Sequence, residues 1–162
     1  MSDSAVGAQG AITESRRPTR GLYTLHTDGG IVAAPGQASG VAAIGAVLKN
    51  SRNLLVEAIS RRIGETDDHQ IAEFRALVAG LQMAKRHGVD QIRVFTDSAL
   101  LVGSVLDDGV KLKSPEHQRL RAKARNLYKS FGDPRLSWVP REMNTEADLL
   151  AGAALPIRPA RG

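Results

Sequence analysis

The sequence predicts an α/β protein, and the order of its apolar segments is the main reason. Three strand-like segments come first with short turns between them, which indicates an antiparallel meander. Helical and strand-like segments follow, giving the order strand, strand, strand, helix, strand, helix, helix, strand, helix. Carboxylates recur beside the ends of these segments, where open α/β sheets place their ligands.

Composition limits the class of protein further. At 162 residues the chain is long enough for one domain with a sizeable core and too short for two. The net charge of +5 favours a polyanionic partner. The absence of cysteine excludes disulfides, thiolate zinc sites and a cysteine nucleophile. Because no apolar run is long enough to span a membrane or resembles a signal core, we expect a cytoplasmic protein without membrane contact.

We expect one folded domain between two tails. Residues 1–20 are small, polar and without periodicity, which predicts a disordered basic N-terminal tail. The folded domain is expected over residues 21–156, and residues 157–162 form a short C-terminal tail.

The first three strands are predicted at residues 21–28, 39–49 and 54–63. The first strand ends on Asp28, and the Gly29–Gly30 pair after it predicts a sharp turn that brings backbone N–H groups near a ligand. A cluster of turn-forming residues between the second and third strands predicts a hairpin.

The next helix and strand carry two more acids. Residues 68–87 form the clearest helix, with Glu73 in its second turn and Gly80 suited to close packing against a strand. A short apolar strand then delivers Asp97, and Ser98 can cap the helix that follows.

The remaining segments are a basic helix, a short strand and a last helix. Residues 110–129 carry seven basic side chains and one acid, and a helix is expected to start at Ser114–Pro115 because proline suits the first helical position. Residues 135–140 predict a last strand. Asn144 is expected to cap a final helix that carries Asp148 near its start.

Four carboxylates, those of Asp28, Glu73, Asp97 and Asp148, converge at one edge of the sheet if the first strand lies beside the central one. Each alone also fits a turn, a cap or a helix start, so only the set indicates a site. Like charges raise one another's pKa, and close carboxylates therefore need cations. Mg²⁺ or Mn²⁺ suits such oxygen ligands, and two ions can support phosphodiester cleavage.

Each of these acids stands in a distinctive block of sequence: YTLHTDGG, IAEFRALVAGL, VFTDSALLVGSV and VPREMNTEADLLAGAAL. Together the blocks resemble those of the type 1 ribonuclease H family, and most closely its short bacterial and plant-like branch. The resemblance covers roughly residues 22–155. It implies a ribonuclease H-like fold: a five-stranded mixed sheet, made of an antiparallel three-strand meander plus parallel strands, flanked by helices.

The resemblance also implies an activity. The family hydrolyses the RNA strand of RNA/DNA hybrids and leaves 5′-phosphate and 3′-hydroxyl products. By this resemblance Asp28 bridges two metal ions, Mg²⁺ or Mn²⁺, and Asp148 helps to hold the ion that activates the attacking water. Glu73 and Asp97 hold the ion that faces the leaving 3′-oxygen.

Contacts with an RNA/DNA hybrid are implied in the same way. Gly29 and Gly30 match a turn against the minor groove, where the 2′-hydroxyl distinguishes RNA. His69 and Gln70 stand where the family has two amide side chains. The expected substrate-binding residues are Gly29, Gly30, His69, Gln70, Ser98, Lys111, Lys113, Arg119, Arg121 and Asn144.

Two other interpretations use the same residues. A catalytically silent nucleic-acid-binding module of this fold explains the basic helix but has no need of four acids. A DNA-cutting nuclease of the same superfamily needs the acids, but the Asp-Gly-Gly and Ala-Glu-Phe-Arg-Ala motifs favour the ribonuclease H branch. We expect a monomer with no obligate protein partner.

Overall fold

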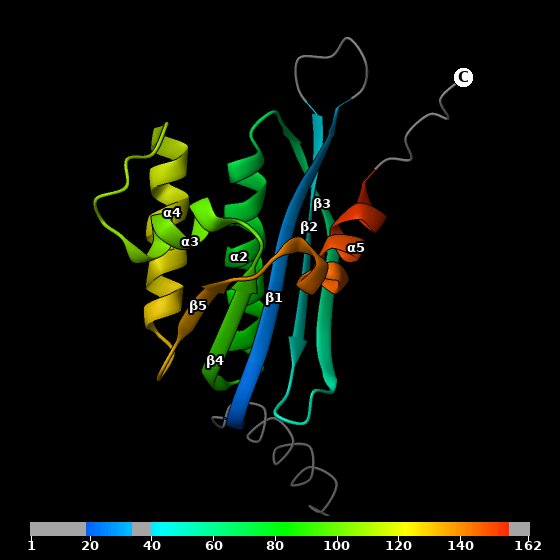
Figure 1. The fold of residues 1–162 in the computed structure, drawn as a ribbon, viewed down its shortest axis with the longest axis vertical. Coiled ribbons are helices and arrows are strands. Elements are labelled where there is room, and N and C mark those ends of the chain that lie inside the picture. The colour runs from blue at the N-terminus through cyan, green and yellow to red at the C-terminus, as the bar shows by residue number, and fades with distance from the viewer. Residues whose placement is uncertain (1–18, 34–39, 156–162) are drawn as a thin grey trace, which may run out of the picture.

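The computed structural model describes residues 19–33 and 40–155, which form a five-stranded sheet with helices on both faces (Figure 1). The strands are β1 (Thr19–Ala33), β2 (Gly40–Lys49), β3 (Leu55–Thr66), β4 (Val89–Thr96) and β5 (Arg135–Trp138). The helices are α2 (His69–Arg86), α3 (Ala99–Leu106), α4 (Pro115–Lys129) and α5 (Thr145–Ala154), preceded by a short 3-10 helix, η1 (Arg141–Met143).

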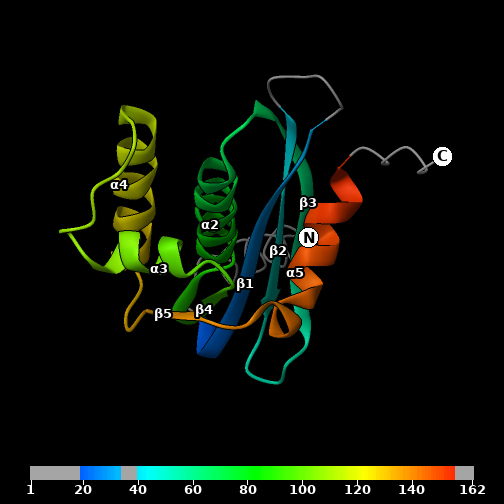
Figure 2. The ribbon, with the colours of Figure 1, turned by 45° about the horizontal axis from the view of Figure 1, so that its top comes forward.

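The order of strands in the sheet is β3-β2-β1-β4-β5. β1 is antiparallel to β2 and parallel to β4, while β2 and β3 are antiparallel and β4 and β5 are parallel. Helix α2 lies against one face of the sheet and α5 against the other, with α3 and α4 beside α2 (Figures 1 and 2). The predicted meander and mixed sheet are confirmed, and the first strand does lie beside the central one.

The predicted hairpin between β2 and β3 is confirmed in detail. The Asn50 side-chain oxygen accepts hydrogen bonds from the backbone N–H groups of Arg52 and Leu54, at 2.9 and 3.1 Å. Asn53 has a positive φ of 62°, a conformation that asparagine tolerates better than most residues. Local side-chain chemistry therefore sets this turn.

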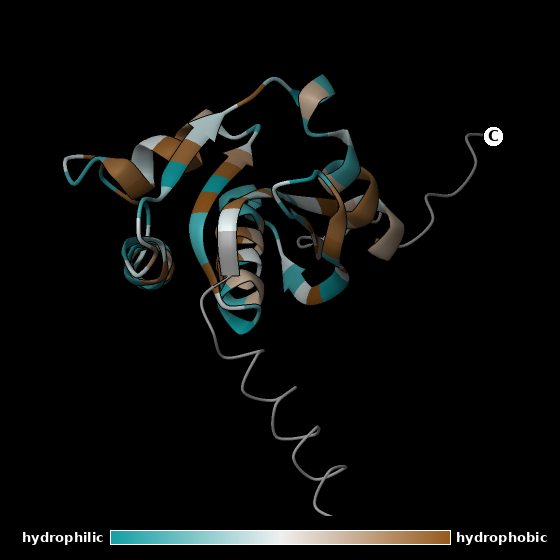
Figure 3. Ribbon diagram, turned by 90° about the horizontal axis from the view of Figure 1, so that it is seen from below, coloured by the Kyte–Doolittle hydropathy of each residue, from teal (hydrophilic) through white to brown (hydrophobic). Residues whose placement is uncertain are grey.

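Helix α2 packs its apolar side on the sheet and contributes more residues to the core than any other element. Its fully buried side chains include those of Phe74, Leu77 and Leu81. A Cβ atom on Gly80 would lie 2.9 Å from the Thr27 Cγ2 atom of β1, so the glycine serves close packing, as predicted. In Figure 3 the outer helix α4, at the left, is mostly hydrophilic.

The predicted turn at Gly29–Gly30 is wrong. β1 continues through Asp28 to Ala33, and the two glycines pair with Ile44 and Ala43 of β2. Neither glycine is among the described residues with positive φ, so no turn conformation is required of them. The ladder with β2 continues here, and hydrogen bonds to a neighbouring strand outweigh the local tendency of paired glycines to turn.

Smaller differences concern the last third of the chain. The predicted strand at 135–140 ends earlier, at Trp138, and η1 follows it. Asn144 occupies the N-cap position of α5, but its side chain makes no capping hydrogen bond. The start of α4 after Ser114, by contrast, is as predicted, because the Ser114 hydroxyl accepts from the His117 backbone N–H.

Several expectations fall outside the described residues. The predicted tails at 1–20 and 157–162 lie there, except that Thr19 and Arg20 begin β1. Among the described residues, no helix is both long and apolar enough to cross a membrane.

Candidate active site

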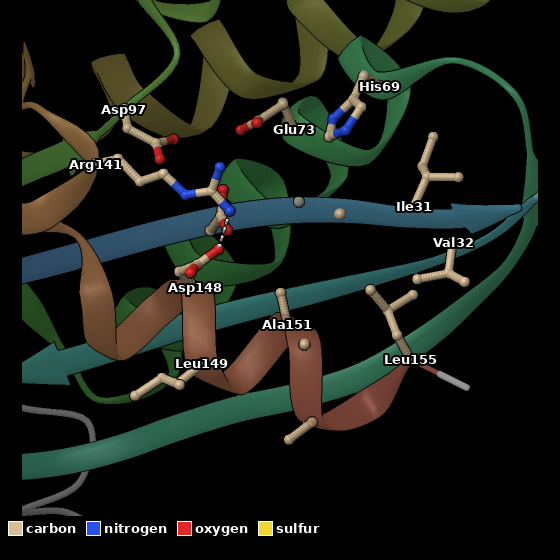
Figure 4. A pocket seen from close by; sticks show the side chains of 15 residues that line it. Ile31, Val32, His69, Glu73, Asp97, Arg141, Asp148, Leu149, Ala151 and Leu155 are labelled. Carbon is tan, nitrogen blue, oxygen red and sulfur yellow. Dashed lines mark hydrogen bonds and ion pairs between the residues drawn. The ribbon is translucent and has the colours of Figure 1, made fainter. Parts of the chain in front are cut away.

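An open cleft of about 910 Å³ lies where β1, α2, β4 and α5 meet (Figure 4). All four predicted acids line it: Asp28, Glu73, Asp97 and Asp148. They come from four different elements, so the sheet and the helices on both of its faces must be in place before the acids can meet.

Asp28 stands at the centre of this arrangement. It lies on β1 opposite Gly45 of β2, and the residue is only 6% exposed. A Cβ atom on Gly45 would lie 2.6 Å from the Ala151 backbone nitrogen of α5. The glycine therefore lets α5 approach the sheet closely, which brings Asp148 beside Asp28.

Glu73 reaches the cleft from the other face of the sheet. Gly29 allows this, because a Cβ atom there would lie 2.5 Å from the Ala72 carbonyl oxygen and 2.6 Å from the Glu73 backbone nitrogen. The Gly29 N–H group lowers the pKa of Glu73, against the larger raising effect of burial. Gly29 thus serves contact between β1 and α2 rather than a turn.

Asp97 follows directly after β4. Its backbone carbonyl accepts a hydrogen bond from the Trp138 indole N–H at 3.1 Å. The Thr96 hydroxyl accepts from the Ser98 backbone N–H at 3.1 Å, and the Ser98 hydroxyl in turn caps α3. These bonds fix the backbone on both sides of Asp97, so its carboxylate is held at the end of the strand, as predicted.

Asp148 lies in the first turn of α5 and faces a cation. The Arg141 guanidinium lies 3.4 Å from the Asp148 Oδ1 atom. Figure 4 shows Arg141 extending into the cleft between Asp97 and Asp148. The side chains of Arg141 and Asp148 are 75% and 36% exposed, so this pair is open to solvent and to a ligand.

The buried acids bind protons tightly in the absence of a metal. Burial, the charge of Asp97 and a hydrogen bond with Asp148 together raise the pKa of Asp28 from 3.8 to about 8, although the charge of Arg141 opposes them. Burial, together with the charges of Asp28 and Asp97, raises the pKa of Glu73 from 4.5 to about 9. Both directions are those expected of clustered carboxylates.

The donor set fits a hard divalent cation. Carboxylate oxygens of Asp28, Glu73 and Asp97 lie within 4.8 Å of one another. The Glu73 Oε2 atom is buried and has no hydrogen-bond partner among the described residues, although buried carboxylate oxygens normally have one. An all-oxygen, acidic set of ligands is the kind that Mg²⁺ and Mn²⁺ take.

We expect these pKa shifts to make the metal-free protein less stable as pH rises. The folded state keeps protons on Asp28 and Glu73 up to about pH 8 and 9, whereas the unfolded chain releases them near 3.8 and 4.5. The folded state therefore binds more protons in this window, and the free energy of unfolding falls as pH rises through it.

Glu73→Gln isolates one part of this effect, because it removes the titrating group and keeps the shape. In EDTA, Glu73→Gln should lose less stability than the unmodified chain as the pH rises from about 5 to about 9. The urea midpoint of the variant minus that of the unmodified chain should therefore grow over this range. A difference that does not change with pH contradicts the raised pKa of Glu73.

Five of the predicted substrate-binding residues lie at or beside the cleft. Gly29, Gly30 and His69 line the cleft itself. Gln70 and Ser98 line a smaller pocket next to Glu73, between α2 and α3.

Two others are engaged inside the protein. Asn144 is 1% exposed, and its side-chain amide donates to the Thr27 backbone carbonyl at 2.9 Å. The half-buried Arg121 donates to the Val110 carbonyl at 2.7 Å. Asn144 ties the start of α5 to the residue before Asp28, and Arg121 holds the chain that leads into α4, so we now expect neither to bind the hybrid. Lys111, Lys113 and Arg119 are exposed, and their contact with a hybrid stays a prediction.

Sequence reasoning missed Arg141 and Gly45 as parts of the site. Arg141 is a cation placed seven residues before Asp148, and the signal was present in the block VPREMNTEADLLAGAAL. Gly45 gave no signal, because its importance depends on α5, which lies 100 residues further along the chain.

Comparison with known proteins now identifies the class. A family model described as reverse transcriptase-like matches residues 27–154. Ribonuclease HI of Halobacterium salinarum is 35% identical over 150 residues, which cover 92% of this chain and 72% of that protein. Bifunctional protein Rv2228c of Mycobacterium tuberculosis is 34% identical over 131 residues, which cover 81% of this chain and 35% of that protein. The chain therefore spans about a third of the length of its mycobacterial relatives.

Solved structures show the same fold. The N-terminal ribonuclease H domain of Rv2228c superposes with a TM-score of 0.74 at 32% identity, covering 83% of this chain and 99% of that one. LC11-RNase H1 in complex with an RNA/DNA hybrid superposes with a TM-score of 0.70 at 30% identity, covering 82% and 96%. This chain belongs to the ribonuclease H family.

Proposed function

We propose that the chain hydrolyses the RNA strand of RNA/DNA hybrids, using two divalent metal ions held by its carboxylate cluster. The observation that carries the proposal is the cluster itself, in which oxygens of Asp28, Glu73 and Asp97 lie within 4.8 Å of one another in an open cleft. A protein that only binds nucleic acid gains nothing from burying acids whose pKa values are raised to about 8 and 9.

Each acid has a distinct place in this proposal. Asp28 lies between the other acids and would contact both ions, with Asp148 beside it. Glu73 and Asp97 would hold the ion nearer the leaving group. When bound, the two ions activate a water molecule and stabilise the charge on the leaving 3′-oxygen, which gives 5′-phosphate and 3′-hydroxyl products.

The surroundings of the cluster suit a nucleic-acid substrate. Gly30 lines the cleft without a side chain, so a ribose and its 2′-hydroxyl can approach the β1 backbone. Arg141 lies at the mouth of the cleft, where its exposed guanidinium can meet a phosphate. The related LC11-RNase H1, which has the same fold, was solved in complex with an RNA/DNA hybrid.

A cleavage assay with matched duplexes tests the proposal. End-labelled RNA/DNA, RNA/RNA, DNA/DNA and single-stranded RNA of one sequence are incubated with Mg²⁺, Mn²⁺ or EDTA. We expect cleavage of the RNA strand of the hybrid with a divalent ion, and none in EDTA. Cleavage of DNA/DNA in preference to the hybrid would favour a DNA-cutting nuclease, and binding without cleavage in any metal would favour a silent module.

The exposed basic residues before and on α4 should bind phosphates. We define Lys111, Lys113 and Arg119 as the basic surface, since all three are exposed and the positively charged chain has a polyanionic partner in this proposal. Changing each to Ala should weaken binding to every hybrid sequence alike, and should flatten the log–log salt dependence of binding by about one unit per lost contact.

Arg121→Ala is the matched comparison for these variants. Because its guanidinium is committed to the Val110 carbonyl, it should lower thermal stability and leave the salt slope unchanged. Salt slopes that are unchanged for Lys111→Ala, Lys113→Ala and Arg119→Ala would show that the basic surface is only a solvated face.

A further inference from the structure

His117 is the one polar residue of α4 that is fully buried, with 3% of its surface exposed. A buried imidazole needs a partner for each ring nitrogen. The Nδ1 atom lies 2.6 Å from the hydroxyl of Ser114, the N-cap of α4. The Nε2 atom lies 2.9 Å from the Oδ2 atom of Asp68, at ion-pair distance but without the alignment of a hydrogen bond.

The other carboxylate oxygen of Asp68 caps a second helix. Asp68 is the N-cap of α2, and its Oδ1 atom accepts from the Gln70 backbone N–H at 2.8 Å. One imidazole therefore connects the caps of two helices, Asp68 of α2 and Ser114 of α4. We call these three side chains the cap bridge.

The two helices carry the two halves of the proposed site. Helix α2 presents His69 to the cleft directly after Asp68, and it carries Glu73 one turn later. The basic surface lies on α4 and on the chain before it, which Arg121 fastens to α4 through the Val110 carbonyl. Arg125 joins α4 to α3 through the Val105 carbonyl. The basic surface is thereby held to α4, and the cap bridge holds α4 to α2.

We propose that the cap bridge positions the basic surface relative to the carboxylate cluster. His117 acts as a positioning residue: it holds the side chains that would bind phosphates at a fixed distance from the acids, so that the bound strand lies with a phosphodiester at the cluster. This inference rests on the proposed hybrid cleavage and adds a residue that contacts neither the metal nor the substrate.

His117→Gln and Asp68→Asn test the cap bridge. Asparagine keeps a side-chain oxygen for the Gln70 N–H, so the α2 cap survives while the charge facing His117 is lost. His87→Gln is the matched control, because His87 pairs with Glu57 at 2.7 Å at the opposite end of α2.

Single-turnover cleavage is measured against enzyme concentration at several salt concentrations. We expect both bridge variants to raise the half-saturating concentration about fivefold, with the maximal rate within about twofold of the unmodified chain. The salt slope should stay unchanged, because no phosphate contact is lost. His87→Gln should change none of the three quantities.

Amide hydrogen exchange in the free protein gives a readout that does not depend on cleavage. We expect faster exchange in the first turn of α4 in His117→Gln and Asp68→Asn, and unchanged exchange in β1 and β4. If the unmodified chain fails to cut hybrids, the proposed function fails, and the exchange result still decides whether the bridge holds the helices.

Three outcomes would contradict the proposed role of the cap bridge. The first is unchanged exchange in the first turn of α4 in both variants. The second is a half-saturating concentration that stays within about twofold of normal in both. The third is a salt slope reduced by about one unit in His117→Gln, which would show that His117 itself binds a phosphate.

Discussion

Asp97→Asn should lower the rate of hybrid cleavage by about two to three orders of magnitude and leave hybrid binding intact. The substitution keeps the shape of the side chain and removes one of the charges that a divalent ion needs. The side chains that would bind phosphates, Arg141 and the basic surface, are unchanged in this variant, so affinity should survive. The rate is measured in single turnover with Mg²⁺, and binding is measured in Ca²⁺ or EDTA.

The same substitution should stabilise the metal-free protein. Asp97 raises the pKa values of both Asp28 and Glu73, so removing its charge relieves repulsion within the cluster. We therefore expect the urea midpoint in EDTA to rise above about pH 9, where Asp28 and Glu73 are ionised in the folded state, while activity is lost. Asp90→Asn, at the other end of β4 and exposed, is the matched control and should change neither quantity. Near-normal turnover of Asp97→Asn in Mg²⁺ would contradict the proposed metal site.

Gly29→Ala should both destabilise the protein and displace one of the four acids. The new Cβ atom would lie 2.5 Å from the Ala72 carbonyl oxygen and 2.6 Å from the Glu73 backbone nitrogen. Backbone atoms cannot yield as a flexible side chain can, so the first turns of α2 must move away from β1. We expect a loss of roughly 1–3 kcal/mol in the free energy of unfolding, and a large loss of activity because Glu73 moves.

Gly30→Ala provides the comparison for stability. Its Cβ atom would meet only the Leu155 Cδ1 atom, at 3.4 Å, which is ordinary van der Waals contact. Urea denaturation should therefore place Gly30→Ala close to the unmodified chain and Gly29→Ala far below it. Equal midpoints for the two variants would contradict the close approach of α2 to β1 on which the position of Glu73 depends.

The sequence predicted those features that depend on neighbours in the chain. Asp97 could be placed because an apolar strand precedes it and a capping serine follows, and the structure has both. The α2 boundaries were within one residue, because Asp68 and Gly88 mark them chemically. The mixed sheet, an antiparallel meander plus parallel strands, was also predicted, through the resemblance to a known family.

The failures all concern partners distant in sequence. The glycines after Asp28 looked like a turn, because nothing local indicates that Ala43 and Ile44 continue the ladder. Nothing in the sequence around His117 indicates that it is buried beside Asp68, which lies far earlier in the chain. Arg121 was counted as a phosphate contact, but a carbonyl of the preceding segment takes its hydrogen bonds. A side chain that pairs with a buried or backbone group cannot be distinguished from an unpaired one by the composition of the sequence.

Anomalous diffraction from Mn²⁺-soaked crystals tests the central claim, that the carboxylate cluster is a metal site. The soak should be made above the pKa of about 8 that burial and Asp97 give Asp28, so that metal binding competes less with protons. We predict an anomalous peak between the carboxylates of Asp28, Glu73 and Asp97 that is lost or weakened in Asp97→Asn crystals. Crystals of a preparation that cleaves hybrids in Mn²⁺, yet show no peak among these three carboxylates, would contradict the account.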